Sequence, residues 1–181
     1  KRLMPEDVAG ILDRAIEEMI ARDATGIVSI SDRVGNVLAV SEHGVSTRYV
    51  QIAPGPGADT AAGNVGLQSA LVPRTAVAIA KAVTGAYVSS GANAFSTRTA
   101  SMIIQPHFPP TTYTVGLESG PLFGLQFSQL ACSDVMASAE AVINRNIGPR
   151  KSPLGMSADP GGFPLYKEGV LVGGIGVSTK A

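Results

Sequence analysis

Few side chains in this sequence could bind a metal or act as a nucleophile. It contains two histidines, His43 and His107, and one cysteine, Cys132. Their spacing, and that of the carboxylates, matches no known metal-ligand pattern, so a metal site could form only through the fold. The nucleophile elbow Gly-x-Ser-x-Gly, His-Glu-x-x-His, Cys-x-x-Cys and the P-loop are absent from the sequence. The residues therefore predict no known catalytic site.

Composition narrows the class of protein. The chain has 181 residues, which is long enough for one domain with a substantial core. Hydrophobic residues make up 45% and the formal net charge is +0, which argues against a disordered chain and against a general nucleic-acid binder. Only 15% of the residues are charged, below the ~25% typical of soluble domains, and this favours a homo-oligomer. No stretch approaches the ~18 consecutive apolar residues of a membrane span.

The start of the chain bears on its origin. It begins at Lys1 rather than at a methionine, so we expect a processed form or part of a longer parent chain, with a single domain over residues 1–181. The sequence does not determine the cellular compartment, although removal of a signal peptide would favour a secreted or periplasmic location. Cys132 has no internal disulfide partner, so we expect a buried thiol or a bond to a cysteine outside this chain.

Three helices are predicted from apolar periodicity and from end signals. Residues 4–22 carry an apolar stripe at three- and four-residue spacing, with a proline near the start. The second helix covers 73–90 and is rich in alanine, which permits close packing. The third covers about 97–105, is capped by Ser96 or Thr97, and ends before a proline.

The first two strands are predicted at 26–31 and 37–41. They are joined by a turn in which Asp32 binds local backbone amides. Residues 42–72 then form a long excursion with a Pro-Gly-Pro-Gly run, of the kind used as a lid, a binding loop or an oligomer contact. We interpret residues 131–155, approximately, as an insertion.

The last strands are predicted as a hairpin, with arms at 163–166 and 170–177 around a turn that contains glycine. Pro164 restricts the first arm to a sheet edge or a bulge. The second arm carries three glycines within 173–176, which indicates a central strand whose backbone is approached closely. Two partners fit this pattern: a tightly packed helix, or a ligand for which the glycines form one wall.

Residues 161–165 read Gly-Gly-Phe-Pro-Leu, and residues 170–178 read Val-Leu-Val-Gly-Gly-Ile-Gly-Val-Ser. This order resembles the GGxPL…GxVxGAIGVSG signature of the GlcG/HbpS-like haem-binding family. Segments 78–86 and 120–125 resemble the family's Ala-x-x-Lys-Ala-x-Thr-Ala and Gly-Pro-Leu-Tyr-Gly-Leu. The resemblance implies an α+β, profilin-like fold, in which helices pack on a single antiparallel sheet of about five strands.

The resemblance also implies haem, or another small anionic molecule, as the ligand. Haem iron needs an axial donor, most often a histidine. Family members have been associated with a histidine on or near the first helix, where this chain has none, and this leaves His107 and His43 as donors. His107 is the preferred metal ligand because the phenylalanine and prolines that follow it could flank a porphyrin. The alternative is an ordinary loop histidine.

The other candidate site residues are assigned to one pocket. Lys81 and Arg98 are expected to meet the propionates, since arginine binds carboxylates through two parallel hydrogen bonds. Each could instead be a surface ion. Gly161, Gly162 and Asp159 are expected to line this pocket beside the second helix.

Two other hypotheses stay open. The chain could be a structural domain that assembles mainly with itself or with its parent chain and has a vestigial pocket. It could also be an enzyme acting on a small acid or a tetrapyrrole, with Asp159 as the suspected carboxylate, although an Asp before Pro-Gly is first a turn former. The expected partners are a second copy of the chain and a small molecule, with no nucleic acid.

Overall fold

The computed structural model describes residues 1–45, 47–53, 67, 69–130, 152 and 154–180. Its main sheet has four antiparallel strands in the order β2-β1-β6-β5. In chain order the helices and strands are α1 (Pro5–Ala21), β1 (Thr25–Asp32), β2 (Val37–His43), β3 (Tyr49–Gln51), β4 (Leu71–Pro73), α2 (Arg74–Val88), α3 (Thr97–Ile103), β5 (Gly162–Lys167) and β6 (Val170–Lys180). Two 3-10 helices, η2 (Thr112–Thr114) and η3 (Leu125–Gln129), follow α3.

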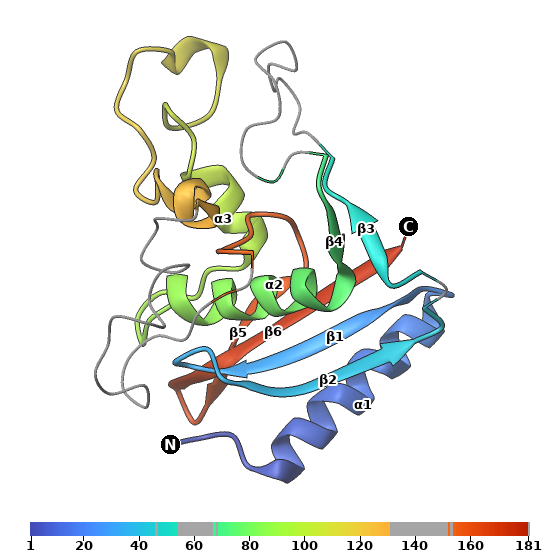
Figure 1. Cartoon of the computed structure of the whole chain (residues 1–181). Helices are drawn as coiled ribbons and strands as arrows, with labels where there is room; N and C mark the ends of the chain where they lie inside the picture. Colours follow the sequence, from blue (N-terminus) through green and yellow to red (C-terminus); the bar gives the residue numbers. More distant parts are fainter. Residues whose placement is uncertain (46, 54–66, 68, 131–151, 153, 181) are drawn as a thin grey trace, which may run out of the picture.

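The two long helices cover opposite faces of the main sheet (Figure 1). α1 packs on β1 and β2, and a Cβ on Gly26 would lie 3.2 Å from the Sδ atom of Met19 in α1. α2 packs on β6, β1 and β5. Because side chains alternate along a strand, Ser29 of β1 points to the α2 side while its neighbours Val28 and Ile30 point to the α1 side. The core therefore consists of two layers, one on each side of β1 and β6.

The α+β class and the antiparallel sheet are confirmed, with a difference in strand number. The main sheet has four strands rather than about five, because β3 and β4 pair with each other in a separate two-stranded ribbon. This ribbon forms the base of the excursion predicted over 42–72, whose residues 54–66 lie outside the described part of the chain. Most of the insertion expected at about 131–155, with Cys132, also lies outside it.

Both predicted hairpins are present because local sequence determines their turns. Asp32 accepts hydrogen bonds from the amides of Val34 and Asn36, both at 2.9 Å, so its carboxylate holds the β1–β2 turn as predicted. In the β5–β6 turn, Glu168 and Gly169 have φ values of 50° and 75°. Two successive positive φ values are typical of tight hairpin turns. β5 is an edge strand and β6 is central, as predicted.

The three predicted helices are also confirmed. Ser96 caps α3 by accepting a hydrogen bond from the Thr99 amide at 3.1 Å, whereas Pro73 precedes α2 without offering a side-chain acceptor. Met19 of the predicted α1 stripe is buried, as expected for a core residue. None of the helices that the structure describes is long and apolar enough to cross a membrane.

The glycines of β6 contact protein. A Cβ on Gly174 or Gly176 would overlap the α2 backbone, at the carbonyl oxygens of Ala82 and Ala78 respectively. Gly173 is approached instead by Ser31 of the neighbouring strand. Of the two partners expected for this strand, the tightly packed helix is the one present, and the interpretation of these glycines as a ligand wall is wrong.

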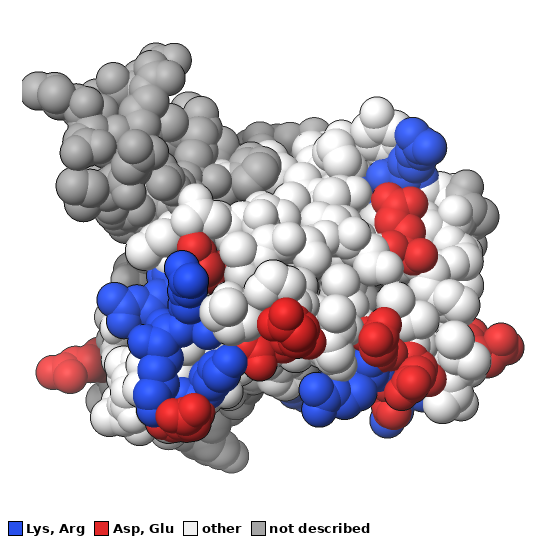
Figure 2. All heavy atoms as spheres, turned by 90° about the horizontal axis from the view of Figure 1, so that it is seen from below, with Lys and Arg blue, Asp and Glu red and all other residues white. Residues whose placement is uncertain are grey.

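Charges of both signs share the face seen from below. Figure 2 shows acidic and basic side chains beside one another on this face. The described residues form three ion pairs, each with an N···O distance of 2.5 Å: Lys1–Glu168, Arg22–Glu18 and Lys167–Asp7. The hydrogen bond from Lys167 is the main cause that lowers the pKa of Asp7. Exposed ion pairs contribute little to stability.

Candidate functional site

Lys81 is the most unusual ionisable residue of the predicted site. It lies in the middle of α2 and is only 9% exposed. Its Nζ donates one long hydrogen bond, of 3.4 Å, to the carbonyl oxygen of Val177 in β6. Burial lowers the pKa of the Lys81 ammonium, while the charge of Asp159 acts in the opposite direction. Lys81 is therefore a buried cation with a weakly satisfied ammonium, and the expectation of a snorkelling surface lysine is wrong.

The two glycines before β5 enclose this lysine. Gly161 has a φ of 120°, and a Cβ there would lie 3.4 Å from the Nζ of Lys81 and would overlap the Val177 carbonyl oxygen. The Gly162 amide donates a hydrogen bond to the hydroxyl of Thr97 at 3.0 Å. A Cβ on Gly162 would overlap both Thr97 and the backbone carbonyl oxygen of Lys81. Protein atoms thus fill the space against Gly162, so a flat ligand has no room there.

Arg98 and Asp159 complete this cluster at its surface. Arg98 follows Thr97 in the first turn of α3 and is exposed. Asp159 is exposed, and its amide donates to the hydroxyl of Ser157 at 3.3 Å. Five of the six predicted site residues therefore gather where α2, α3 and the start of β5 meet. We call this group the Lys81 cluster: Lys81, Arg98, Asp159, Gly161 and Gly162.

A small cavity lies beside the Lys81 cluster. Its volume is about 170 Å³, and it lies between α2, η3 and the segment before β5. Most of its lining is apolar, with polar atoms from Gln129, Ser157 and Asp159. Ligand pockets for drug-sized molecules are usually about 300–1,000 Å³, so this cavity admits a small molecule and cannot enclose a porphyrin. The pocket expected for a flat tetrapyrrole beside Gly161 and Gly162 stays a prediction.

His107 is not part of the Lys81 cluster and lies in the irregular chain after α3. It is half-buried, and its Nδ1 lies 2.9 Å from the hydroxyl oxygen of Thr114. That hydroxyl has one proton, which it donates to a backbone carbonyl of Pro109 or Thr111. Towards His107 it therefore accepts, so Nδ1 carries the proton and the Nε2 of the neutral ring keeps its lone pair. This is the tautomer in which Nε2 can ligate a metal.

The chain around His107 exposes many apolar side chains. Residues 102–130 contain a single formally charged residue, Glu118. Two of the aromatic rings, Phe123 and Phe127, pack edge to face with their centroids 6.0 Å apart. We call the set of exposed large apolar residues the 102–130 surface: Met102, Phe108, Tyr113, Val115, Leu117, Phe123, Phe127 and Leu130. Where exposed apolar residues gather in one patch, they often mark a binding surface.

No group of three or more His, Cys, Asp or Glu residues that could hold a metal ion occurs among the described residues. His43, the second histidine, is the last residue of β2 and is half-buried.

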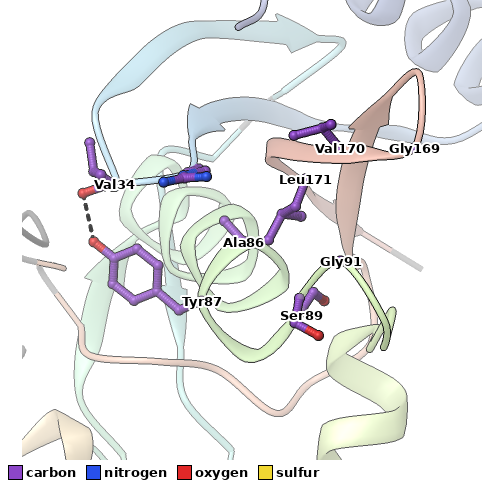
Figure 3. Close-up of a pocket in the computed structure, with 10 residues that line it drawn as sticks. Val34, Ala86, Tyr87, Ser89, Gly91, Gly169, Val170 and Leu171 are labelled. Atoms are coloured by element: carbon purple, nitrogen blue, oxygen red, sulfur yellow. Dashed lines mark hydrogen bonds between the residues drawn. The ribbon is translucent and has the colours of Figure 1, made fainter. Parts of the chain in front are cut away.

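A second, larger hollow was not predicted from the sequence. It has a volume of about 690 Å³ and lies between the C-terminal end of α2 and the turns of both hairpins (Figure 3). The Tyr87 hydroxyl donates to the carbonyl oxygen of Val34 at 2.8 Å and ties α2 to the β1–β2 turn at its edge. Val170 and Leu171 supply an apolar wall, and Arg33 is the charged residue in the lining. None of the six predicted site residues lines this hollow.

Comparison with known proteins places the fold. No protein-family model and no curated protein matches the sequence. Among solved structures, the PduOC–heme complex aligns with a TM-score of 0.53 and 18% identity, over 100% of this chain and 85% of the other. The Klebsiella pneumoniae protein ORFY, of the family DUF336, aligns with a TM-score of 0.48 and 17% identity, over 98% of this chain and 79% of the other. The first alignment confirms the fold that the resemblance to the GlcG/HbpS-like family implied.

Proposed function

We propose that this chain is a ligand-binding domain and that it binds haem at the 102–130 surface, with His107 as the axial donor. The protonation of His107 carries this proposal, because the hydrogen bond to Thr114 leaves Nε2 with a free lone pair. The similar fold of the PduOC–heme complex supports haem as the first ligand to test.

The surroundings of His107 supply the other contacts that haem requires. Phe108 follows His107 directly and is 39% exposed, so its ring is available to an apolar ring system. When bound, haem supplies an iron atom that takes one donor from the protein. Arg98, at the exposed start of α3, is the cation of the predicted set that remains accessible for a propionate. Lys81 is buried and is less suited to that role.

A haem titration of the wild-type chain and of His107→Ala, followed by the Soret absorbance, tests this proposal. We expect saturable binding to the wild type and loss of the ligated spectrum in His107→Ala. His43→Ala is the matched control, since the chain contains two histidines, and it should bind as the wild type does. An unligated haem spectrum in the wild type would overturn the proposal.

A second candidate is a small carboxylate held at the Lys81 cluster. The observation that favours it is the buried Lys81 ammonium, whose single hydrogen bond within the described chain is 3.4 Å long. Asp159, of the same cluster, lines the cavity of about 170 Å³, whereas Lys81 does not. A carboxylate there would give the ammonium a charged acceptor. Calorimetric titration with acetate should show saturable binding that Lys81→Met removes, and equal binding by both proteins would overturn this candidate.

Self-association is the competing use of the 102–130 surface. Edge strand β2 exposes further apolar side chains, Val37, Leu38 and Val40, so a second copy has apolar area available in two places. Sedimentation velocity at micromolar concentration distinguishes the two uses. A haem-free monomer would leave the surface available for haem, whereas a haem-free oligomer weakened by Phe108→Ser would assign the surface to assembly.

A further inference from the structure

Arg74, the first residue of α2, is a buried cation whose Nε has no hydrogen-bond partner among the described residues. It is 8% exposed. The ion pairs found in the described part of the chain involve other residues, and of the guanidinium nitrogens only Nε is both buried and without a hydrogen-bond partner. Buried charged groups are nearly always paired, because an unpaired one retains its full desolvation cost.

The position of Arg74 adds a second electrostatic cost. The N-terminal end of a helix carries a partial positive charge, and acidic residues usually occupy the first turn. α2 has no acidic residue in its first turn and has Arg74 at its first position. A positive side chain therefore lies at the positive end of a 15-residue helix. Both costs would be relieved by one anion.

Backbone donors are available at the same place. The first amides of a helix lack acceptors within the helix. The Arg74 amide donates to the carbonyl oxygen of Arg48 at 2.9 Å, but Pro73 caps the helix without a side-chain acceptor. No described residue accepts from the amides of Thr75 or Ala76. These two N–H groups are free to bind an oxyanion, as helix N-termini commonly do.

Helix geometry favours an Arg74 side chain that leans towards this end of the helix. Cα–Cβ bonds tilt towards the helix N-terminus, so the side chain at the first position leans towards the open end. Ala78, one turn after Arg74, lies over Gly176 of β6. Because α2 runs antiparallel to β6, Arg74 lies beside Ser178, two residues further along the strand. Glu42 of β2 lies in the same cross-strand row as Ser178, on this face of the sheet. It is exposed and forms no ion pair with Arg74.

We propose that the start of α2 is an oxyanion-binding site, in which the Arg74 guanidinium and the amides of Thr75 and Ala76 hold a phosphate or carboxylate group. Arg48, exposed and bonded through its carbonyl oxygen to the Arg74 amide, is the adjacent cation. A guanidinium can grip such a group through two hydrogen bonds, and helix amides add donors aimed at the same oxygen atoms. This site is separate from both His107 and the Lys81 cluster, so it stands independently of the proposed function.

Titration of the wild-type chain with inorganic phosphate, and separately with acetate, at constant ionic strength tests the site. We expect a saturable rise in Tm with at least one anion, and amide chemical-shift changes that are largest at Thr75 and Ala76. Saturable binding of phosphate alone would identify phosphate groups as the ligand of this site. Saturable binding of acetate would show that the site also takes carboxylates. No saturable response to either would overturn the proposal.

Variants separate the site from a general salt effect. Arg74→Met keeps most of the side-chain volume and should weaken anion binding by about tenfold or more, because a charge-assisted bond is lost. Arg14→Gln, at an exposed position on α1, is the matched control and should bind anions as the wild type does. Glu42→Gln should bind equally or more tightly. Unchanged binding by Arg74→Met would overturn the proposal, and if that variant does not fold, Arg74→Lys should bind more weakly than the wild type.

Discussion

Gly174 of β6 lies directly beneath Ala82 of α2. A Cβ on Gly174 would overlap the carbonyl oxygen of Ala82 and would lie 2.9 Å from the backbone nitrogen of Ala86. The helix backbone therefore rests on the strand backbone, with no side chain between them. This contact sets the height of α2 above the sheet and, through it, the positions of Lys81 and Arg74 on the same helix.

Because neither backbone can move aside without disturbing the whole layer, we expect Gly174→Ala to lower the free energy of unfolding by roughly 3 kcal/mol. Gly91→Ala is the matched control, since a Cβ there would meet no atom within 4 Å. Its effect should stay within about 0.5 kcal/mol. Urea unfolding of both variants checks this, and a Gly174→Ala variant as stable as the control would contradict the close contact.

Thr97 joins α3 to the start of β5. Its hydroxyl accepts the hydrogen bond from the buried Gly162 amide, so Thr97→Val should leave that amide without an acceptor and cost about 1–3 kcal/mol. Thr112→Val, at an exposed position in η2, should be nearly neutral. Equal stability of the two variants in urea would show that the Gly162 amide has another acceptor.

The sequence predicts the elements of the fold well because the signals for them are local. The carboxylate of Asp32 and the glycine at 169 determine their turns within a few residues. The apolar stripe of α1 is likewise visible in the sequence. The close approach at 173–176 was also predicted, but the choice between its two expected partners stayed open, because a glycine is equally suited to a helix backbone and to a ligand.

The site was predicted less well, because burial depends on segments far apart in the chain. Lys81 is covered by Gly161 and β6, about 80 to 100 positions later, so the sequence showed a lone lysine and not its enclosure. The partner of His107 is Thr114, the last residue of the short 3-10 helix η2, and no periodicity in the sequence predicts this helix. The burial of Arg74 has the same cause, since α2 looks ordinary until its neighbours are known.

Lys81 should make stability depend on pH in the alkaline range. Burial lowers its folded-state pKa below the unfolded value of 10.5, so the unfolded chain binds more protons between the two values. Stability should therefore rise with pH as Lys81 loses its proton in the folded state. The stability of the wild type relative to Lys81→Met should increase as the pH rises towards 10.5. A difference that is flat or falls over this range would contradict the burial of a charged Lys81.

Thr114 should tune the affinity of His107 for haem. It accepts the Nδ1 proton and so fixes the tautomer and the ring orientation. Thr114→Val keeps the shape of the side chain but cannot accept that proton, so haem should bind about 10- to 100-fold more weakly. The measurement is the Soret titration at fixed pH. Unchanged affinity would mean that Thr114 does not orient the imidazole.

The central claim is that the Nε2 atom of His107 ligates haem iron. The most direct test is a haem titration of His107→Ala with and without added imidazole, beside His43→Ala. We predict that His107→Ala loses the ligated Soret spectrum, that free imidazole restores it, and that His43→Ala keeps it throughout. A His107→Ala chain that gives the wild-type spectrum without imidazole would contradict the claim.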